Sequence, residues 1–162
     1  MIQISHDIKI FSDTEVFFDF YNNYESTFIK LAPKNHIRFR FLNPPPVQIG
    51  TTTESEEIML GKYQKVRHRI VEYTPERIVL RGLFPLSLIG GKLTFRIEKH
   101  DGYILLFEII EFGFKSAIGR LYDTILRIYL KDKYTFLNNH SKETLSNIKK
   151  ILEDKTLYTP TT

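Results

Sequence analysis

The chain has 162 residues, of which 42% are hydrophobic, 14% aromatic and 26% charged, and its net charge is +4. This length predicts a single domain with a sizeable core, and the composition excludes a disordered chain. The chain contains no cysteine, which excludes disulfides, thiolate metal sites and a cysteine nucleophile. The basic residues are scattered and match no nucleic-acid-binding motif, so we predict no nucleic-acid partner.

The first ten residues, MIQISHDIKI, alternate apolar and polar side chains. This pattern predicts a strand over residues 2–11 and not a signal peptide. No apolar stretch approaches the ~18 residues that span a bilayer. We therefore expect no transmembrane segment and, by default, a cytoplasmic location.

Apolar residues then recur at helical spacing up to Pro33, and Asn22-Asn23 divides this segment into two short helices. Alternating patterns follow in six further segments and predict six more strands, many of them joined by hairpin turns. These segments are residues 36–41, 51–60, 65–70, 78–80, 93–98 and 103–112.

Beyond Gly113 the apolar period changes from two to near 3.6, which predicts one helix extending to about residue 153. At ~1.5 Å per residue such a helix is too long to stand alone, so it requires a curved sheet to pack on. We predict an α+β fold with one domain over residues 1–154 and a frayed tail over 155–162.

Three stretches of sequence carry a resemblance to a known superfamily. They are IQISHDIKIFSDTEVFFDF, EIMLGKYQKVRHRIVEYTPERIVL and the final GRLYDTILRIYLKDKYTFLNNHSKETLSNIKKILED. In order and turn positions they resemble the SRPBCC superfamily, which includes START-like, pollen-allergen-like and polyketide cyclase proteins. The resemblance implies a helix-grip fold, in which a seven-stranded antiparallel sheet curves around the long C-terminal helix after two short helices. The same fold hosts binders, transporters, cyclases and hydrolases.

The resemblance and the aromatic content together predict an internal cavity for a small hydrophobic or lipid-like ligand. The loop around Gly90-Gly91 is expected to lie near its mouth. The expected lining residues come from two strands, one loop and the long helix: Phe39, Phe41, Phe84, Phe95, Tyr122, Ile125, Tyr129 and Phe136. Close packing of the same side chains, without a cavity, is the alternative.

A second hypothesis is a metal site. Imidazole and carboxylate groups are suitable ligands for zinc, and His36, Glu57, His140 and Glu143 form the candidate set. No cofactor is predicted as the main interpretation. With zinc, the chain resembles hydrolases of this fold that cleave acylated phenols, so a polyketide cyclase-like or metal-dependent hydrolase remains an alternative. An interaction module without a ligand is the third alternative.

The strand over residues 51–60 carries glutamates on both faces, because Glu56 and Glu57 point in opposite directions. At least one carboxylate is therefore expected to face the interior. Glu56, Glu57 and His68 are the candidate catalytic residues, and a simple pair between an inward glutamate and His68 is the favoured interpretation. Pairing of the glutamates with arginines on neighbouring strands is expected for those that face outward.

Overall fold

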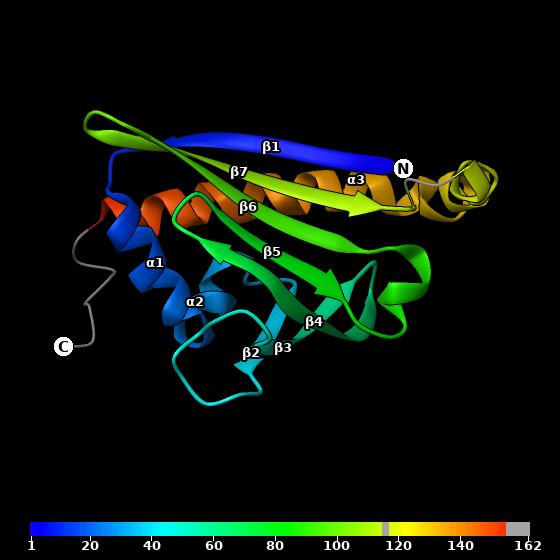
Figure 1. Ribbon diagram of the computed structural model, residues 1–162, viewed down its shortest axis with the longest axis horizontal. Helices are drawn as coiled ribbons and strands as arrows, with labels where there is room; N and C mark the ends of the chain where they lie inside the picture. Colours follow the sequence, from blue (N-terminus) through cyan, green and yellow to red (C-terminus); the bar gives the residue numbers. More distant parts are fainter. Residues whose placement is uncertain (115–116, 155–162) are drawn as a thin grey trace.

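The computed structural model describes residues 1–114 and 117–154, and between 117 and 132 it describes only the side chains of Thr124, Ile128 and Lys131. In this part of the chain, seven strands form one antiparallel sheet in the order β1-β7-β6-β5-β4-β3-β2 (Figure 1). Hairpins join β2 through β7 in sequence, while β1 pairs with β7 at the opposite edge. The helix-grip architecture expected from the sequence is confirmed.

The strands follow the predicted alternating segments closely. They are β1 (Ile2–Ile10), β2 (His36–Phe41), β3 (Thr52–Met59), β4 (Lys62–Thr74), β5 (Arg77–Gly82), β6 (Lys92–His100) and β7 (Tyr103–Phe112). One difference is that β4 continues to Thr74, with a register shift between Ile70 and Glu72. Because of this bulge, Tyr73 faces inward although it is an odd number of residues from Ile70. The alternating pattern is therefore interrupted, and the sequence alone did not reveal that the strand continues beyond Ile70.

In the described residues, three α-helices and one short 3-10 helix accompany the sheet. Two short helices, α1 (Thr14–Asn22) and α2 (Tyr24–Leu31), meet at Asn23, as the sequence predicts. The 3-10 helix η1 (Leu86–Ile89) lies in the loop between β5 and β6. The long helix α3 (Ala117–Glu153) ends where expected, whereas the predicted tail over 155–162 lies outside the described residues.

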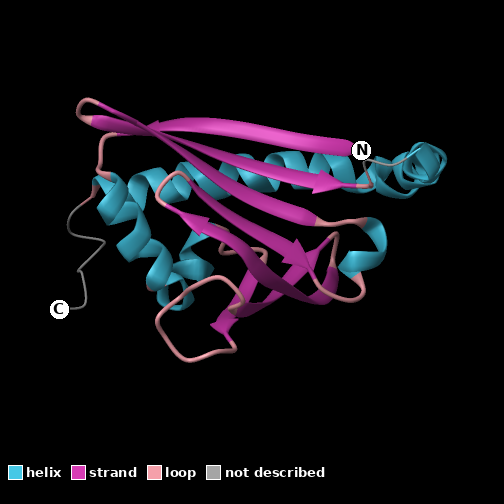
Figure 2. Ribbon diagram, in the orientation of Figure 1, coloured by secondary structure: helices cyan, strands magenta, loops and turns pink. Residues whose placement is uncertain are grey.

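Helix α3 runs along the β1–β7 edge of the sheet, and because the sheet is curved, α2 also contacts α3 (Figure 2). Two hydrogen bonds hold the C-terminal end of α3. Asn147 Nδ2 donates to the Leu31 carbonyl at 2.9 Å, and the Phe11 amide donates to Glu153 Oε1 at 2.8 Å. Among the described residues, no helix is both long and apolar enough to cross a membrane.

The two faces of the sheet differ in chemistry. On the outer face, Glu54 lies beneath Arg40, Arg67 and Lys65 and is only 1% exposed. The hydrogen bond from Arg40, followed by that from Arg67, lowers the pKa of Glu54 to about 2. The expected pairing of outward glutamates with cations on neighbouring strands is therefore present.

The inner face carries two hydrophobic clusters. The larger lies where α1 and α2 meet the sheet, and includes Phe17, Phe20, Tyr21 and Phe95. The smaller gathers Ile4, Phe112 and Leu137, with partly buried side chains such as Met59, Ile110 and Phe136 packed against it. Fully burying one medium-sized apolar side chain contributes about 2 kcal/mol, so the larger cluster dominates the stability of the fold.

Candidate functional site

Three potential metal ligands meet inside the protein. His36 begins β2, Glu57 lies on β3 and His140 lies on α3, and one ligand atom of each falls within 4.8 Å of the other two. His36 and Glu57 are register partners on neighbouring strands. His140 is 104 residues further along the chain than His36, so only the packing of α3 against the curved sheet completes this His–Glu cluster.

The two imidazoles face each other through their Nε2 atoms, which are 3.1 Å apart. The Nδ1–H of His36 donates to the Phe28 carbonyl at 2.7 Å. In the neutral ring this bond leaves the lone pair on Nε2, directed at His140. Phe28 also stacks on His36 with ring centres 3.8 Å apart, so the orientation of this ring is determined by its neighbours.

The pKa of His36 is lowered to about 4, mainly by burial, which outweighs the raising effect of the hydrogen bond to the Phe28 carbonyl; the adjacent His140 adds a smaller lowering effect. Burial also lowers the pKa of His140, while the charge of Glu143 raises it. Both rings are therefore neutral at physiological pH, which is the form that binds metal ions.

Two carboxyl groups accompany the histidines. Glu108 on β7 faces inward and accepts a hydrogen bond from Ser141 Oγ. The pKa of Glu108 is raised to about 7, mainly by burial, with a smaller contribution from nearby Glu57 and against the lowering effect of the Ser141 hydrogen bond. Burial likewise raises the pKa of Glu57. A carboxyl group that titrates near neutrality can hold or release a proton, as general acid–base chemistry requires.

The geometry of the two histidines fits zinc. Nitrogens bound tetrahedrally to zinc at about 2.0–2.1 Å are about 3.3 Å apart, close to the observed 3.1 Å between the Nε2 atoms. With Glu57 as a third ligand, a fourth position is left for water or substrate. The same distance also fits a hydrogen bond from His140 Nε2 to His36 Nε2. In that arrangement His140 Nδ1 is buried and has no hydrogen-bond partner among the described residues.

The structure brings together three of the four residues in the metal hypothesis. Glu143 lies outside the group that can share one ion and acts on His140 through its charge. Of the catalytic candidates, Glu57 faces the interior, whereas Glu56 lies on the outer face beside Lys65 at 3.3 Å. The favoured pair between an inward glutamate and His68 is absent from the described residues, because His68 lies opposite Thr53 and Glu57 lies opposite Gln64.

The expected cavity-lining residues are distributed among different environments. Phe39 and Phe95 belong to the larger hydrophobic cluster, and Phe41 packs against it. Phe136 stacks beside His140 with ring centres 5.7 Å apart, while Phe84 is 75% exposed in the β5–β6 loop. The side chains of Tyr122, Ile125 and Tyr129 lie outside the described part of the chain.

Glu108 and Ser141 were not among the sequence-based candidates. The alternation of the 103–112 segment contained the signal for Glu108, because it shares the inward parity of Ile104, Leu106 and Ile110. A glutamate among apolar inward neighbours is unusual enough to mark a site. Ser141 carries no such signal, since only its position on α3 opposite β7 gives it a role.

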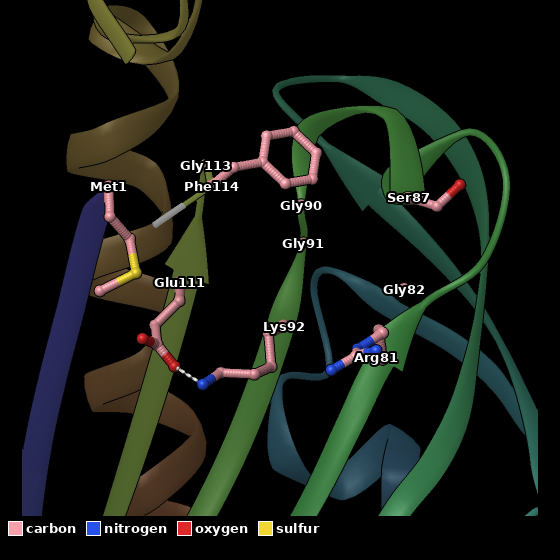
Figure 3. Close-up of a pocket in the computed structure, with 10 residues that line it drawn as sticks. All are labelled: Met1, Arg81, Gly82, Ser87, Gly90, Gly91, Lys92, Glu111, Gly113 and Phe114. Carbon is pink, nitrogen blue, oxygen red and sulfur yellow. Dashed lines mark ion pairs between the residues drawn. The ribbon is translucent and has the colours of Figure 1, made fainter. Parts of the chain in front are cut away.

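Two pockets formed by described residues lie away from the His–Glu cluster. One, of about 370 Å³, opens at the end of the sheet between Met1, Phe114 and Arg81, where Lys92 reaches across to Glu111 (Figure 3). The other, of about 440 Å³, lies beside the α1–α2 junction and the loop after Phe41. Neither includes a residue of the His–Glu cluster.

Comparison with solved structures finds the same fold in proteins of diverse function. The chain aligns with ginseng major latex-like protein 151 from Panax ginseng (TM-score 0.66, 10% identity, 94% of this chain and 98% of that one). It also aligns with Aha1 from Colwellia psychrerythraea, solved as a dimer (TM-score 0.62, 14% identity, 94% of this chain and 97% of that one). A third structure is the di-domain ARO/CYC StfQ of the steffimycin biosynthetic pathway (TM-score 0.67, 13% identity, 96% of this chain and 52% of that one). This chain therefore spans about half the length of StfQ.

No family model and no curated protein matches the sequence. The structural likenesses confirm the helix-grip fold, and at these identities they show the fold alone. The chemistry of this chain must accordingly be argued from its own residues.

Proposed function

We propose that this chain binds a small, largely apolar molecule in the half of its interior that lies beside the 83–91 loop. The observation that carries the proposal is a difference in packing along the inner face of the sheet. Near α1 and α2 this face is fully enclosed, as shown by Ile70 at 0% exposure. Toward the 83–91 loop, Met59, Leu93 and Ile110 also face inward, yet each is only partly buried. Since interiors are normally close-packed, this residual exposure supports a space for a ligand.

The His–Glu cluster supplies the polar end of that space. It lies beside the smaller hydrophobic cluster, because His140 stacks on Phe136 and Leu137 follows Phe136 along α3. Ligand sites in proteins typically combine an apolar wall with a few fixed polar groups. We infer that the apolar part of the ligand packs against Leu93, Ile110 and their neighbours while a polar group reaches His36, Glu57 and His140.

A fluorescent apolar probe tests this proposal. The neutral dye N-phenyl-1-naphthylamine is expected to bind with one molecule per chain. Leu93→Trp fills the proposed space and is expected to weaken binding by at least about tenfold. Ile109→Trp is the matched control, because Ile109 is also partly buried but faces outward on the adjacent strand. Absence of dye binding, or equal binding by both variants, would contradict the proposal.

A metal-dependent hydrolase is the second candidate, and the 3.1 Å approach of two neutral imidazoles beside Glu57 favours it. A bound zinc would polarise a substrate carbonyl and activate water at the open position. Glu108, whose carboxyl accepts a hydrogen bond from Ser141, would hold a proton for this reaction. Phe28 and Phe136 stack on the two histidines and limit access of bulk water.

Zinc titration with elemental analysis separates this candidate from simple ligand binding. One zinc ion per chain is expected, and His36→Ala and His140→Ala are each expected to lose it. His100→Ala is the control, because His100 is exposed at the end of β6, away from the cluster. If the control and the two cluster variants retain zinc equally, the metal site is excluded. If neither zinc nor the dye binds, an interaction module without a ligand is the remaining class.

A further inference from the structure

His68 is a partly buried histidine that the His–Glu cluster does not use. It lies on β4, faces the interior, and pairs in register with Thr53 on one side and Gly82 on the other. Glu57 of the His–Glu cluster lies four residues beyond Thr53 on β3, where it pairs with Gln64. His68 therefore belongs to a different part of the inner face, closer to the 83–91 loop.

His68 and Thr53 both lack a hydrogen-bonding partner in the described part of the chain. The Thr53 hydroxyl is fully enclosed, with the residue at 0% exposure, and remains unsatisfied. The His68 ring forms no hydrogen bond, although it retains some accessible surface. Leaving a buried polar group unpaired costs about 1–3 kcal/mol. The Thr53 hydroxyl is such a group, and the partly accessible His68 ring lies beside it, so one bound molecule can complete the hydrogen bonds of both.

The surroundings of His68 determine what that partner can be. Burial lowers the pKa of His68 to about 4, so the ring is neutral and offers one donor and one acceptor. Thr53 adds a hydroxyl group, which also donates and accepts. Neither side chain is charged, and neither would compensate a carboxylate or phosphate. The pair matches an uncharged oxygen, such as a hydroxyl or a carbonyl.

The 83–91 loop packs against Gly82, the register partner of His68. Gly82 has no side chain, and a Cβ there would lie 2.6 Å from Leu86 Cβ. Leu86 can therefore fold over β5 beside His68, while Ile89 packs with the smaller hydrophobic cluster. The loop thus adds an apolar cover to a wall that carries one polar pair.

We propose that His68 and Thr53 form a second polar contact for the ligand, one that recognises an uncharged hydroxyl or carbonyl oxygen on a mainly apolar, ring-sized molecule. This inference rests on the proposed binding function and names the substrate class of the same interior. It favours hydroxylated aromatic compounds over fatty acids, because an anionic head group would find no cation beside this pair among the side chains that the structure describes.

Two probes of similar size test the inference. Binding of 2-naphthol and of naphthalene is measured by fluorescence for the wild type and for His68→Phe and Thr53→Val. Both substitutions remove hydrogen-bonding atoms while approximately keeping shape. Each is expected to weaken 2-naphthol binding by about tenfold, as for one lost hydrogen bond, and to leave naphthalene binding unchanged. The decisive quantity is the loss of affinity for 2-naphthol relative to that for naphthalene, since a general loss of folding weakens the binding of both probes.

The outcomes separate the inference from the proposed function. Suppose that the wild type binds both probes and that each variant either binds both as well as the wild type does or loses affinity for both equally. His68 and Thr53 then have no role in recognition, while the binding function stands. If the wild type binds neither probe, the binding function and this inference are both wrong. Thr53→Val provides an independent reading where His68→Phe fails to fold.

Discussion

Glu108 is a carboxyl group on the inner face of β7, only 6% exposed, and it accepts a hydrogen bond from the Ser141 hydroxyl. Its pKa is about 7 because burial penalises the charged form, and Glu57 adds a second negative group nearby. A carboxyl group in this environment costs stability whenever it is ionised. Proteins keep such groups mainly where they serve a site.

Replacing Glu108 by glutamine is expected to stabilise the protein at neutral and alkaline pH. Below about pH 4.5 the carboxyl is protonated in both the folded and the unfolded chain. Between about 4.5 and 7 only the unfolded chain releases the proton, so wild-type stability falls as pH rises through this window. At about pH 8 the variant should be more stable by about 3 kcal/mol, measured by urea unfolding.

The control for this measurement is Glu98→Gln, which changes a glutamate paired with Arg96 on the outer face. Its stability should follow that of the wild type within about 0.5 kcal/mol. A Glu108→Gln variant that shows no gain above neutral pH would mean that Glu108 is ionised without cost, and its proposed proton-holding role would lose its basis.

At the scale of elements, the 83–91 loop, which connects β5 to β6, packs against Gly113 just beyond the end of β7. Gly90 has a positive φ of 62°, and a Cβ at this position would lie 2.4 Å from the Gly113 carbonyl oxygen. The Gly113 amide in turn donates to the Ile89 carbonyl at 2.8 Å. This close approach of two backbones holds the loop against the start of the segment that leads to α3.

Gly90→Ala is expected to destabilise the protein more than Gly102→Ala. Both glycines have positive φ, but Gly102 lies in an open turn with nothing within 4 Å of a built Cβ. The Gly102 variant should cost about 1 kcal/mol for backbone strain alone. The Gly90 variant should cost a further ~1–3 kcal/mol from steric overlap. Thermal unfolding compares the two, and equal costs would show that the loop can move away from Gly113 freely.

At the scale of the whole molecule, the His–Glu cluster connects β2, β3 and α3, so a metal bound there would link the two edges of the fold. Anything that binds only the folded state stabilises it by an amount set by its concentration and affinity. A zinc ion that bridges α3 and the sheet would therefore be seen in global unfolding.

Addition of zinc at about 100 times its dissociation constant is expected to stabilise the wild type by about 2.7 kcal/mol. A chelator should reverse the effect, and Glu57→Gln should reduce it because the carboxylate ligand is lost. Since the pKa of His36 is about 4, the stabilisation should persist at mildly acidic pH. Zinc that stabilises Glu57→Gln as much as the wild type would place the ion elsewhere.

The element order could be predicted because each signal is local. Alternation marks the strands, the Asn22-Asn23 break divides α1 from α2, and the change of period after Gly113 marks α3. The direction of the glutamates on β3 could not be predicted, since both parities contain apolar residues and carboxylates. Burial of Glu57 was decided by its pairing with His36 and Gln64 on the neighbouring strands.

The sequence by itself determined the fold class, the order of the elements and the absence of cysteine chemistry, because periodicity and composition act over a few residues at a time. Only the tertiary structure decided that His36 meets His140, that Ser141 reaches Glu108, and that His68 has no hydrogen-bond partner among the described residues. The two contacts join helix α3 to strands β2 and β7, which are far from it in the sequence. Curvature and helix placement come from packing of the whole chain, which no local pattern contains.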